Sequence, residues 1–188
     1  MSADPHDLCA LADLKAWLNI PTGNTTDDGI LQRLLTSVSV CMQNWMNRTI
    51  PSASYTETRD GTGTDSLVLS NRPVTAVASV AVFNQAVLPS PDGIQAGFVF
   101  DGWKVYMIGD VFPRGRQNID VTYTGGFATV PFDLAQACIE QAAYQYRAKS
   151  HIGQTGTGMG PEHISFSSAD FTPGTKTVMQ QYKTVVAL

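Results

Sequence analysis

The segment Val121-Thr-Tyr-Thr-Gly-Gly-Phe-Ala-Thr-Val-Pro-Phe-Asp-Leu134 contains the transition that decides the fold. Apolar and polar residues alternate up to Tyr123, which is the period of a β-strand. Two glycines follow, and Pro131 then stands where proline is favoured, at the first position of a helix. From Leu134 the apolar residues recur at helical spacing up to about Lys149. The segment therefore predicts a strand that ends a sheet and is followed directly by a helix.

Two helices are predicted on the amino-terminal side of the sheet. A helix over 10–19 has three leucines on one face and ends before Pro21. Capping residues in 24–28 precede a long amphipathic helix that ends near Arg48. Its apolar stripe consists of Ile30, Leu31, Leu34, Leu35, Val38, Cys41, Met42, Trp45 and Met46. Helices therefore stand on both sides of the sheet in the sequence.

Between these helices the hydrophobic period is two from Tyr55 to Phe127. The predicted strands cover 55–59, 66–69, 74–83, 98–100, 103–108 and 119–123. Asp101-Gly102, between two apolar runs, is the strongest hairpin signal in the chain. We expect an antiparallel sheet or small barrel that is inserted into a helical core.

The predicted fold class is α+β, with a helical core of about three to four helices, the inserted antiparallel β region and an extended C-terminal tail. Residues 1–52 are expected to form the N-terminal helices of the core, and 53–128 the β region. The C-terminal core helix follows in 129–152. Residues 153–188 are expected to form a flexible glycine-rich linker, a short helix over 175–182 and a docking tail.

Charged residues are scarce, at 15% of the chain against ~25% in an ordinary soluble domain. Lysine and glutamate are depleted where a partner covers the surface, because their desolvation is costly. The polar face of the long helix is almost uncharged. We therefore predict self-association through Gln32, Thr36, Gln43 and Asn47. A monomer with a polar but uncharged surface is the alternative.

The sequence offers little support for catalysis, a metal ion or a cofactor, and none of these is predicted. The glycines of 153–160 follow a helix and lack the lysine of a phosphate-binding loop. His6, His151 and His163 do not form the spaced pairs that metal sites use. The chain is therefore expected to be no enzyme.

The three cysteines, Cys9, Cys41 and Cys138, lie far apart in the sequence and are odd in number. Such cysteines are typical of reduced thiols packed in a core, and of a protein that assembles in a cytoplasm. No basic patch with an apolar stretch begins the sequence, so no secretion signal is expected. No run of ~18 apolar residues indicates a membrane span.

A net charge of −4 and a pI of about 5.2 argue against tight binding to a phosphate backbone. Arg114 and Arg116 form the one local basic spot. Solvation, an acidic patch on a neighbouring subunit and nucleic acid are the three candidate environments for these two arginines.

The order of the predicted elements resembles the head–tail connector, or adaptor, proteins of tailed phages and gene transfer agents. The resemblance rests on Leu-Ala-Asp-Leu-Lys-Ala-Trp-Leu-Asn-Ile at 11–20, on Tyr-Thr-Glu-Thr-Arg-Asp-Gly-Thr-Gly at 55–63, and on the Val121–Leu134 segment. It covers about residues 7 to 150. The order and spacing of these stretches are more specific than any one of them.

The resemblance implies a structural protein of the virion neck, at the head–tail interface, which assembles in the host cytoplasm. It implies a homo-oligomeric ring of about twelve copies beneath the portal, joined to head-closure or tail proteins. Double-stranded DNA would pass through the ring without tight binding. The family's C-terminal segment commonly contacts the portal, so Tyr182, Val185, Val186 and Leu188 are the expected portal-docking residues.

Two alternatives remain open from the sequence alone. One is a tail-completion or head-closure component, which also has a β-rich body. The other is a carbohydrate-binding β module that uses Trp103 and Tyr106 as a stacking platform. Against the second stands the alternation of Trp103, Val105 and Met107, which predicts that these three side chains face the core.

Overall fold

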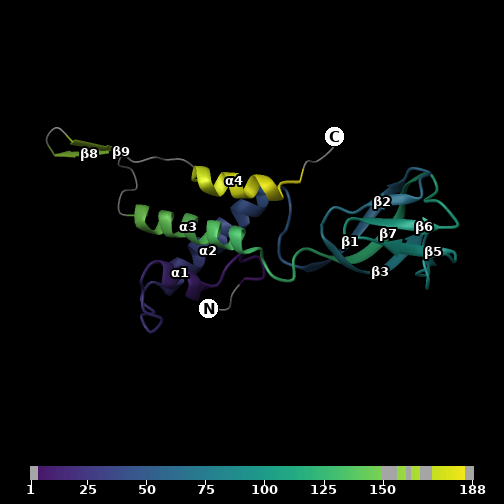
Figure 1. The fold of residues 1–188 in the computed structure, drawn as a ribbon, viewed down its shortest axis with the longest axis horizontal. Helices are drawn as coiled ribbons and strands as arrows, with labels where there is room; N and C mark the ends of the chain where they lie inside the picture. Colours follow the sequence, from purple (N-terminus) through teal and green to yellow (C-terminus); the bar gives the residue numbers. More distant parts are fainter. Residues whose placement is uncertain (1–3, 150–155, 160–161, 166–170, 185–188) are drawn as a thin grey trace. The chain divides into compact units, whose positions relative to one another are not determined.

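The computed structural model describes residues 4–149, 156–159, 162–165 and 171–184. The chain divides into two compact units (Figure 1). The helical unit contains 1–48 and 130–188, and the β unit contains 49–129. The β unit is thus an insertion between two parts of the helical unit. The predicted α+β class is confirmed.

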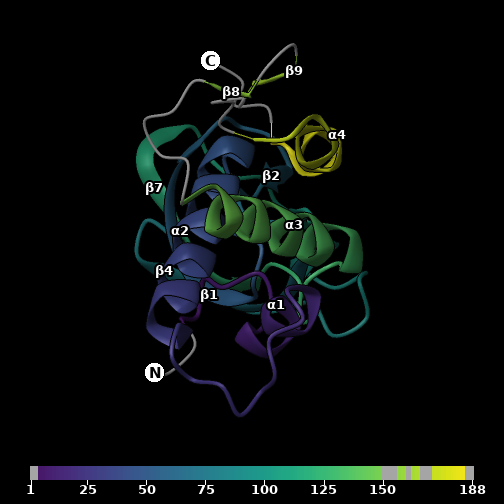
Figure 2. The ribbon, with the colours of Figure 1, turned by 90° about the vertical axis from the view of Figure 1, so that its left-hand side faces the viewer.

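The helical unit is built from α1 (Leu11–Trp17), α2 (Asp28–Met46), α3 (Phe132–Ala148) and α4 (Pro173–Tyr182). Helix α3 lies across α2 and is flanked by α1 and α4 (Figure 2). The helices pack through one apolar core of Leu14, Leu31, Leu35, Val38, Met42, Met46, Leu134, Cys138, Ala142 and Met179. The spacing of these residues along each helix is the reason that the helices could be predicted.

The ends of the helices follow from local chemistry. Asn47 ends α2 in the left-handed conformation, with φ of 54°. Helix α4 begins with Pro173 in its first turn, and the Thr172 side chain accepts a hydrogen bond from the Thr175 N–H at 3.3 Å. The first helix is shorter than predicted, because Asn19 already has a positive φ of 57°.

The β unit contains a four-stranded sheet in the order β1-β7-β3-β4 and a three-stranded sheet in the order β2-β6-β5. All strand pairs are antiparallel. The strands are β1 (Ala53–Gly61), β2 (Ser66–Val68), β3 (Val74–Val82), β4 (Gln85–Val87), β5 (Gly97–Phe100), β6 (Lys104–Ile108) and β7 (Gly115–Gly125). One core joins both sheets, formed by Leu69, Val74, Val80, Phe98, Val105, Met107, Phe112, Ile119, Val121 and Tyr123.

The pair Gly125-Gly126 closes the β unit at the end of β7. A Cβ on Gly125 would lie 2.4 Å from the Asn71 carbonyl oxygen. Gly126 has a φ of +103°, and a Cβ there would lie 2.7 Å from the Pro51 carbonyl oxygen. The next residue, Phe127, donates its N–H to the Ile50 carbonyl at 2.8 Å. The two glycines thus let the chain leave the sheet beside the point where it entered.

Two hairpins differ in whether their turn residues made them predictable from the sequence. The predicted Asp101-Gly102 turn joins β5 to β6, and the Asp101 carboxylate accepts hydrogen bonds from the Trp103 and Lys104 N–H groups at 2.9 and 2.8 Å. Strand β4 was not predicted. Its hairpin with β3 turns at Phe83 and Asn84, both with positive φ, and phenylalanine is no usual turn residue.

The glycine-rich stretch differs from its prediction as a linker. Strand β8 (Gly156–Met159) pairs antiparallel with β9 (Glu162–Ser165). Thr157 in β8 and Ile164 in β9 are β-branched residues, and the glycine content concealed their strand propensity. The remainder of that linker prediction, in 153–155 and 160–161, lies outside the described residues.

Candidate interaction surfaces

The polar face of α2 binds the chain's own N-terminal segment. The amide of Gln32 and the hydroxyl of Thr36 donate to the two Asp7 carboxylate oxygens, each at 2.7 Å. The Gln43 amide donates to the His6 carbonyl oxygen at 2.9 Å. Gln32 and Gln43 are therefore buried, with exposed fractions of 8% and 7%.

These contacts give the scarcity of charge on α2 a cause within one subunit. Of the four residues predicted for self-association, the structure brings Gln32, Thr36 and Gln43 together under residues 6–7, while Asn47 lies exposed at the end of the helix. The self-association prediction itself stays a prediction. Part of its motive, an uncovered polar face, is changed by the structure: residues 6–7 bind Gln32, Thr36 and Gln43, while Asn47 remains exposed.

Cys9 and Cys138 are neighbours, although 129 positions separate their numbers. The Ser39 hydroxyl oxygen accepts a hydrogen bond from the Leu8 N–H at 3.1 Å and lies 3.4 Å from the Cys138 sulfur. Hydrogen bonding to the Cys138 thiol, followed by burial, raises the pKa of the Cys9 thiol. The same bond with Cys9 lowers the pKa of the Cys138 thiol. The wide sequence separation concealed this pair from the sequence analysis.

Lys15 fixes the loop between α1 and α2 from inside. Its ammonium donates to the Thr22 and Asn24 carbonyl oxygens at 3.1 and 2.7 Å, and to the Asp28 carboxylate at 2.7 Å. The Lys15 side chain is only 4% exposed. A buried lysine is tolerable here because all three of its donors are used.

Helix α4 belongs to the helical unit. Met179 and Thr175 are buried, and Phe171 just before the helix is 9% exposed. The Tyr182 hydroxyl hydrogen-bonds the Asp133 carboxylate at 2.8 and 2.9 Å, and the Thr184 N–H donates to the Met46 carbonyl at 2.9 Å.

These contacts show where one part of the predicted docking tail lies. Tyr182 is held against α3 by its hydrogen bond to Asp133, and its docking role stays a prediction. The other three predicted docking residues, Val185, Val186 and Leu188, lie outside the described residues.

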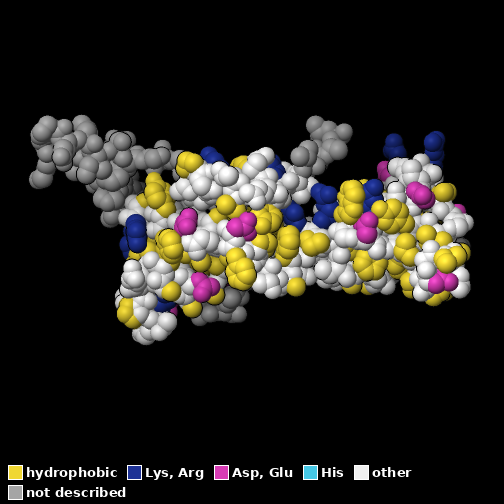
Figure 3. Space-filling view, in the orientation of Figure 1, with side chains coloured by type: hydrophobic (Ala, Val, Ile, Leu, Met, Phe, Trp, Pro, Cys, Tyr) yellow, Lys and Arg dark blue, Asp and Glu magenta, His cyan; other side chains and the backbone are white. Residues whose placement is uncertain are grey.

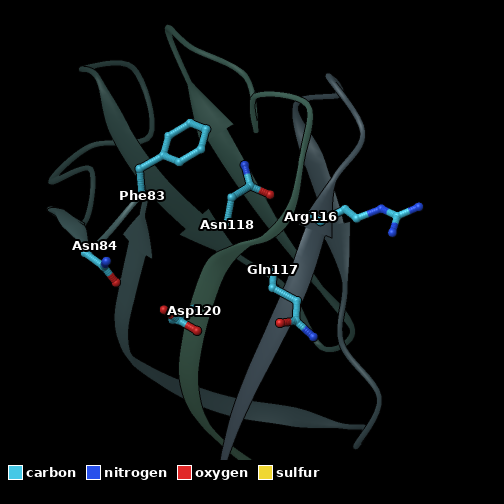
Figure 4. Close-up of a pocket in the computed structure, with 6 residues that line it drawn as sticks. All are labelled: Phe83, Asn84, Arg116, Gln117, Asn118 and Asp120. Atoms are coloured by element: carbon cyan, nitrogen blue, oxygen red, sulfur yellow. The ribbon is translucent and has the colours of Figure 1, made fainter.

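Arg114 and Arg116 are both exposed in the β unit. Arg114 donates from Nε to the Thr62 carbonyl at 3.3 Å. Arg116 lines a shallow hollow of about 220 Å³ together with Phe83, Asn84, Gln117, Asn118 and Asp120, and its guanidinium extends away from Phe83 (Figure 4). The predicted contact of these two arginines with a partner or DNA stays a prediction.

Large aliphatic side chains project from the loop between β4 and β5. Leu88 is 76% exposed and Ile94 is 82% exposed. The loop is ordered by Asp92, whose carboxylate accepts the N–H groups of Ile94 and Gln95, each at 2.9 Å. These hydrogen bonds lower the pKa of Asp92. The β unit also has a groove of about 360 Å³, whose lining is mostly apolar and includes Val87, the residue before the loop. Its lining residues are Val82, Phe83, Gln85, Ala86, Val87, Met107, Asp110, Val111 and Pro113.

We call the 88–96 loop and this groove the β-unit apolar surface. Figure 3 shows hydrophobic side chains spread among white atoms over both units, with few charged side chains between them. A loop that is stiffened by hydrogen bonds and still exposes two aliphatic side chains is typical of a surface that another protein covers.

The two residues proposed as a stacking platform for carbohydrate are not buried: Trp103 is exposed and Tyr106 is partly exposed. Val105 and Met107 are buried, as predicted, but Trp103 is 46% exposed, so its predicted place in the core is wrong. The Lys104 ammonium lies 4.5 Å from the centre of the Trp103 ring. Tyr106 is tied to Asp101 through its hydroxyl at 3.0 Å.

Two further findings concern the described part of the chain. It contains no group of three or more His, Cys, Asp or Glu side chains that could hold a metal ion. Within the same residues, no helix combines the length and the apolar character that crossing a membrane requires.

Comparison with known proteins decides the family. The model of the head completion protein family matches residues 7–185, which is nearly the whole chain. The chain belongs to the head completion protein family. A comparison with curated proteins gives no match.

Solved structures with a similar fold come from gene transfer agent particles. A chain from the neck of an empty gene transfer agent particle, computed with C6 symmetry, is 21% identical with a TM-score of 0.63, and the match covers 100% of this chain and 95% of that one. A chain from the neck of a native particle, computed with C12 symmetry, is 17% identical with a TM-score of 0.63, covering 100% and 94%. A chain from a native virion is 19% identical with a TM-score of 0.62, covering 100% and 95%.

At these identities the structural likeness establishes the fold, and the family match establishes the kind of role. This head completion protein is a structural protein of the head–tail connector type, as the sequence resemblance implied. Its family and its structural neighbours are structural particle proteins, which suggests a non-enzymatic role.

Proposed function

We propose that this head completion protein forms a ring of identical subunits in the neck of the particle, beneath the portal, and links it to head-closure or tail proteins. The observation that carries the proposal is the family match over residues 7–185. Maps of the similar necks were computed with C6 and C12 symmetry, which supports a ring of about twelve copies. Head-to-tail contacts between identical subunits close into such rings.

Double-stranded DNA passes through the proposed ring without being held. The chain has a net charge of −4, so few counterions would be released from a duplex that it contacted. Arg114 and Arg116 are the only cationic pair that we expect near DNA or an acidic neighbour. A gel-shift assay at low salt should show no discrete complex with a duplex, whereas a submicromolar, salt-sensitive complex would contradict this part of the proposal.

The portal-docking element is proposed to be the end of the chain, with Val185, Val186 and Leu188 as its apolar side chains. Its starting point is fixed, because the Thr184 N–H is bonded to the Met46 carbonyl at 2.9 Å. An apolar segment that leaves a fixed point can enter a groove or add to a sheet edge of a partner. In a ring, each docked tail raises the effective concentration of the others.

Truncation after Thr184 tests the docking element without removing α4. The truncated protein should melt within a few degrees of the full chain, since the buried residues of α4 remain in place. It should no longer co-purify with the portal protein, and heads made with it should fail to join tails. Full-strength portal binding by the truncated protein would overturn the assignment of the tail.

The β-unit apolar surface is proposed as the contact with a second protein of the neck. Leu88 and Ile94 are the most exposed large apolar side chains of the β unit. Covering both would remove apolar surface from water without requiring that any lysine or glutamate be desolvated. A stable contact with another protein therefore explains this surface better than permanent exposure to solvent does.

A further inference from the structure

The place where Cys9 meets Cys138 combines two features that a buried structural thiol does not need. Cys9 is partly exposed and Cys138 is buried, so one thiol of the pair is accessible to a reagent in solution and the other is not. The segment that carries Cys9 is held over α3, because Leu8 donates its N–H to Ser39 and Ser39 contacts the Cys138 sulfur. Ser39 thus joins the N-terminal segment to Cys138, and the Cys9 side chain interacts with the Cys138 side chain at the same place.

We propose that Cys9 and Cys138 form an intramolecular disulfide when the protein meets a low-molecular-weight disulfide, such as oxidised glutathione. A reducing cytoplasm keeps such a pair as free thiols, and an oxidising environment outside the cell does not. We expect the bond to form after the particle has left the host, and this timing rests on the proposed function. The bond itself rests only on the placement of the two cysteines.

The reaction proceeds by two thiol–disulfide exchanges. The Cys9 sulfur attacks the oxidised reagent, forms a mixed disulfide and releases one reduced thiol. The Cys138 sulfur then attacks the Cys9 sulfur of that mixed disulfide and releases the second reduced thiol. Two cysteine thiols are oxidised, one reagent disulfide is reduced, and the two cysteine protons pass to the released thiols.

The division of roles follows from access and from proton affinity. Of the two cysteines in the pair, Cys9 alone is accessible to the reagent. Hydrogen bonding with Cys138 raises the pKa of Cys9, so its first attack is slow. The second attack is intramolecular, because the Cys138 thiol lies next to Cys9 and needs no reagent from solution. A slow first exchange followed by a fast second exchange would keep the amount of mixed disulfide low throughout the reaction.

The consequence for the fold is a covalent link between the N-terminal segment and α3. The same segment supplies Asp7, which binds Gln32 and Thr36 on α2. The link would close a loop of about 130 residues, and cross-links over long loops restrict the unfolded chain most. The N-terminal cover of α2 would therefore become permanent outside the cell.

The test uses the full chain with Cys41→Ser, because Cys41 is exposed and would react with glutathione by itself. The protein is incubated with oxidised glutathione, its remaining thiols are alkylated, and its intact mass is measured. We expect loss of two hydrogens, no alkylation and no glutathione adduct, with one cross-linked peptide that contains Cys9 and Cys138. Oxidation should raise the melting temperature by roughly 5–10 °C, and dithiothreitol should reverse the rise.

The Cys41→Ser, Cys138→Ala variant is the matched control, and it should keep a stable glutathione adduct on Cys9. A persistent adduct on Cys9 in the Cys41→Ser protein, or two alkylated thiols, would overturn the proposal. Because the experiment needs no ring and no portal, its failure would leave the proposed neck function untouched.

Discussion

The helical unit and the β unit are both poor in charge, but their uncharged side chains are placed differently. On α2 the uncharged side chains Gln32, Thr36 and Gln43 bind the chain's own residues 6–7. In the β unit, the uncharged side chains of Leu88 and Ile94 project from an ordered loop into solvent. One surface is already covered within the subunit, and the other is available to a partner.

This difference shows that low charge alone does not locate an interface. A polar, uncharged residue is equally suited to a contact between subunits and to a contact within one subunit, because both exclude water. Large aliphatic side chains with high exposure are more specific, since nothing in the subunit accounts for their placement.

The largest expected effect is the loss of α4 by truncation after Gly160. Removing the buried Met179, Thr175 and Phe171 opens the face of α3 and α2, at a cost of at least about 4 kcal/mol. Hydrogen-exchange mass spectrometry should show lost protection in α2 and α3 but unchanged protection in β1 and β7. Unchanged protection in α2 and α3 would mean that α4 stands apart from the helical unit.

Lys15→Met should destabilise the helical unit by about 2–3 kcal/mol. The substitution keeps the apolar stem but leaves the Asp28 carboxylate and two loop carbonyls without their donor. Chemical denaturation followed by circular dichroism measures the loss. Lys176→Met, at an exposed position on α4, is the control and should change the stability by less than about 0.5 kcal/mol. Equal effects of the two substitutions would show that the loop contacts contribute nothing.

Tyr123→Phe should destabilise the β unit by about 1.5–3 kcal/mol, because the Tyr123 hydroxyl donates to Glu57 and accepts from the Asn71 N–H. Tyr55→Phe is a matched control on the adjoining ring, 5.7 Å away. The buried Tyr55 hydroxyl has no hydrogen-bond partner among the described residues, so its removal should be neutral. A loss of the same size in both variants would contradict the assigned network.

The same tyrosine predicts how stability depends on pH. Burial, together with the Glu57 carboxylate, raises the pKa of Tyr123 to about 12 from its ordinary 10. The unfolded chain therefore releases this proton first as the pH rises. The contribution of the protonated Tyr123 hydroxyl to the free energy of unfolding is therefore complete below pH 10. It is lost as the pH rises through about 12. Chemical denaturation at a series of pH values should show that the stabilities of the wild type and Tyr123→Phe converge over that range. A constant difference in stability between the two proteins would refute the pKa shift.

The smallest expected effect on folding is that of Leu88→Ser combined with Ile94→Ser. Both side chains are mostly exposed, so stability should change by less than about 0.5 kcal/mol per site. Assembly into the neck should nevertheless weaken by about tenfold or more, measured as incorporation into particles. The control is Ile30→Ser with Val40→Ser, at exposed apolar positions of the helical unit. Equal loss of incorporation in both double variants would contradict the assignment of the partner contact to the β unit.

The fold class was predictable from the sequence because period and turn chemistry are local. The apolar stripes of α2 and α3 and the Asp101-Gly102 hairpin needed no information from distant residues. Strand β4 was missed because its turn uses Phe83, and β8 and β9 were missed because glycine content indicated a linker.

The interaction surfaces were harder to predict because they depend on contacts between distant segments. Nothing near Gln32 in the sequence indicates that Asp7 will bind it, and nothing near Cys138 indicates Cys9. The exposure of Leu88 is equally invisible, since an apolar residue after a strand is as typical of a core as of a surface.

The decisive measurement is a side-chain-resolution reconstruction of the neck in the particle that carries this protein. We expect a ring of copies in which Leu88 and Ile94 are covered by a second protein chain, while Asp7 still binds Gln32 and Thr36 within each subunit. A ring in which α2 of one subunit meets its neighbour with residues 6–7 displaced, and in which Leu88 and Ile94 face solvent, would contradict it.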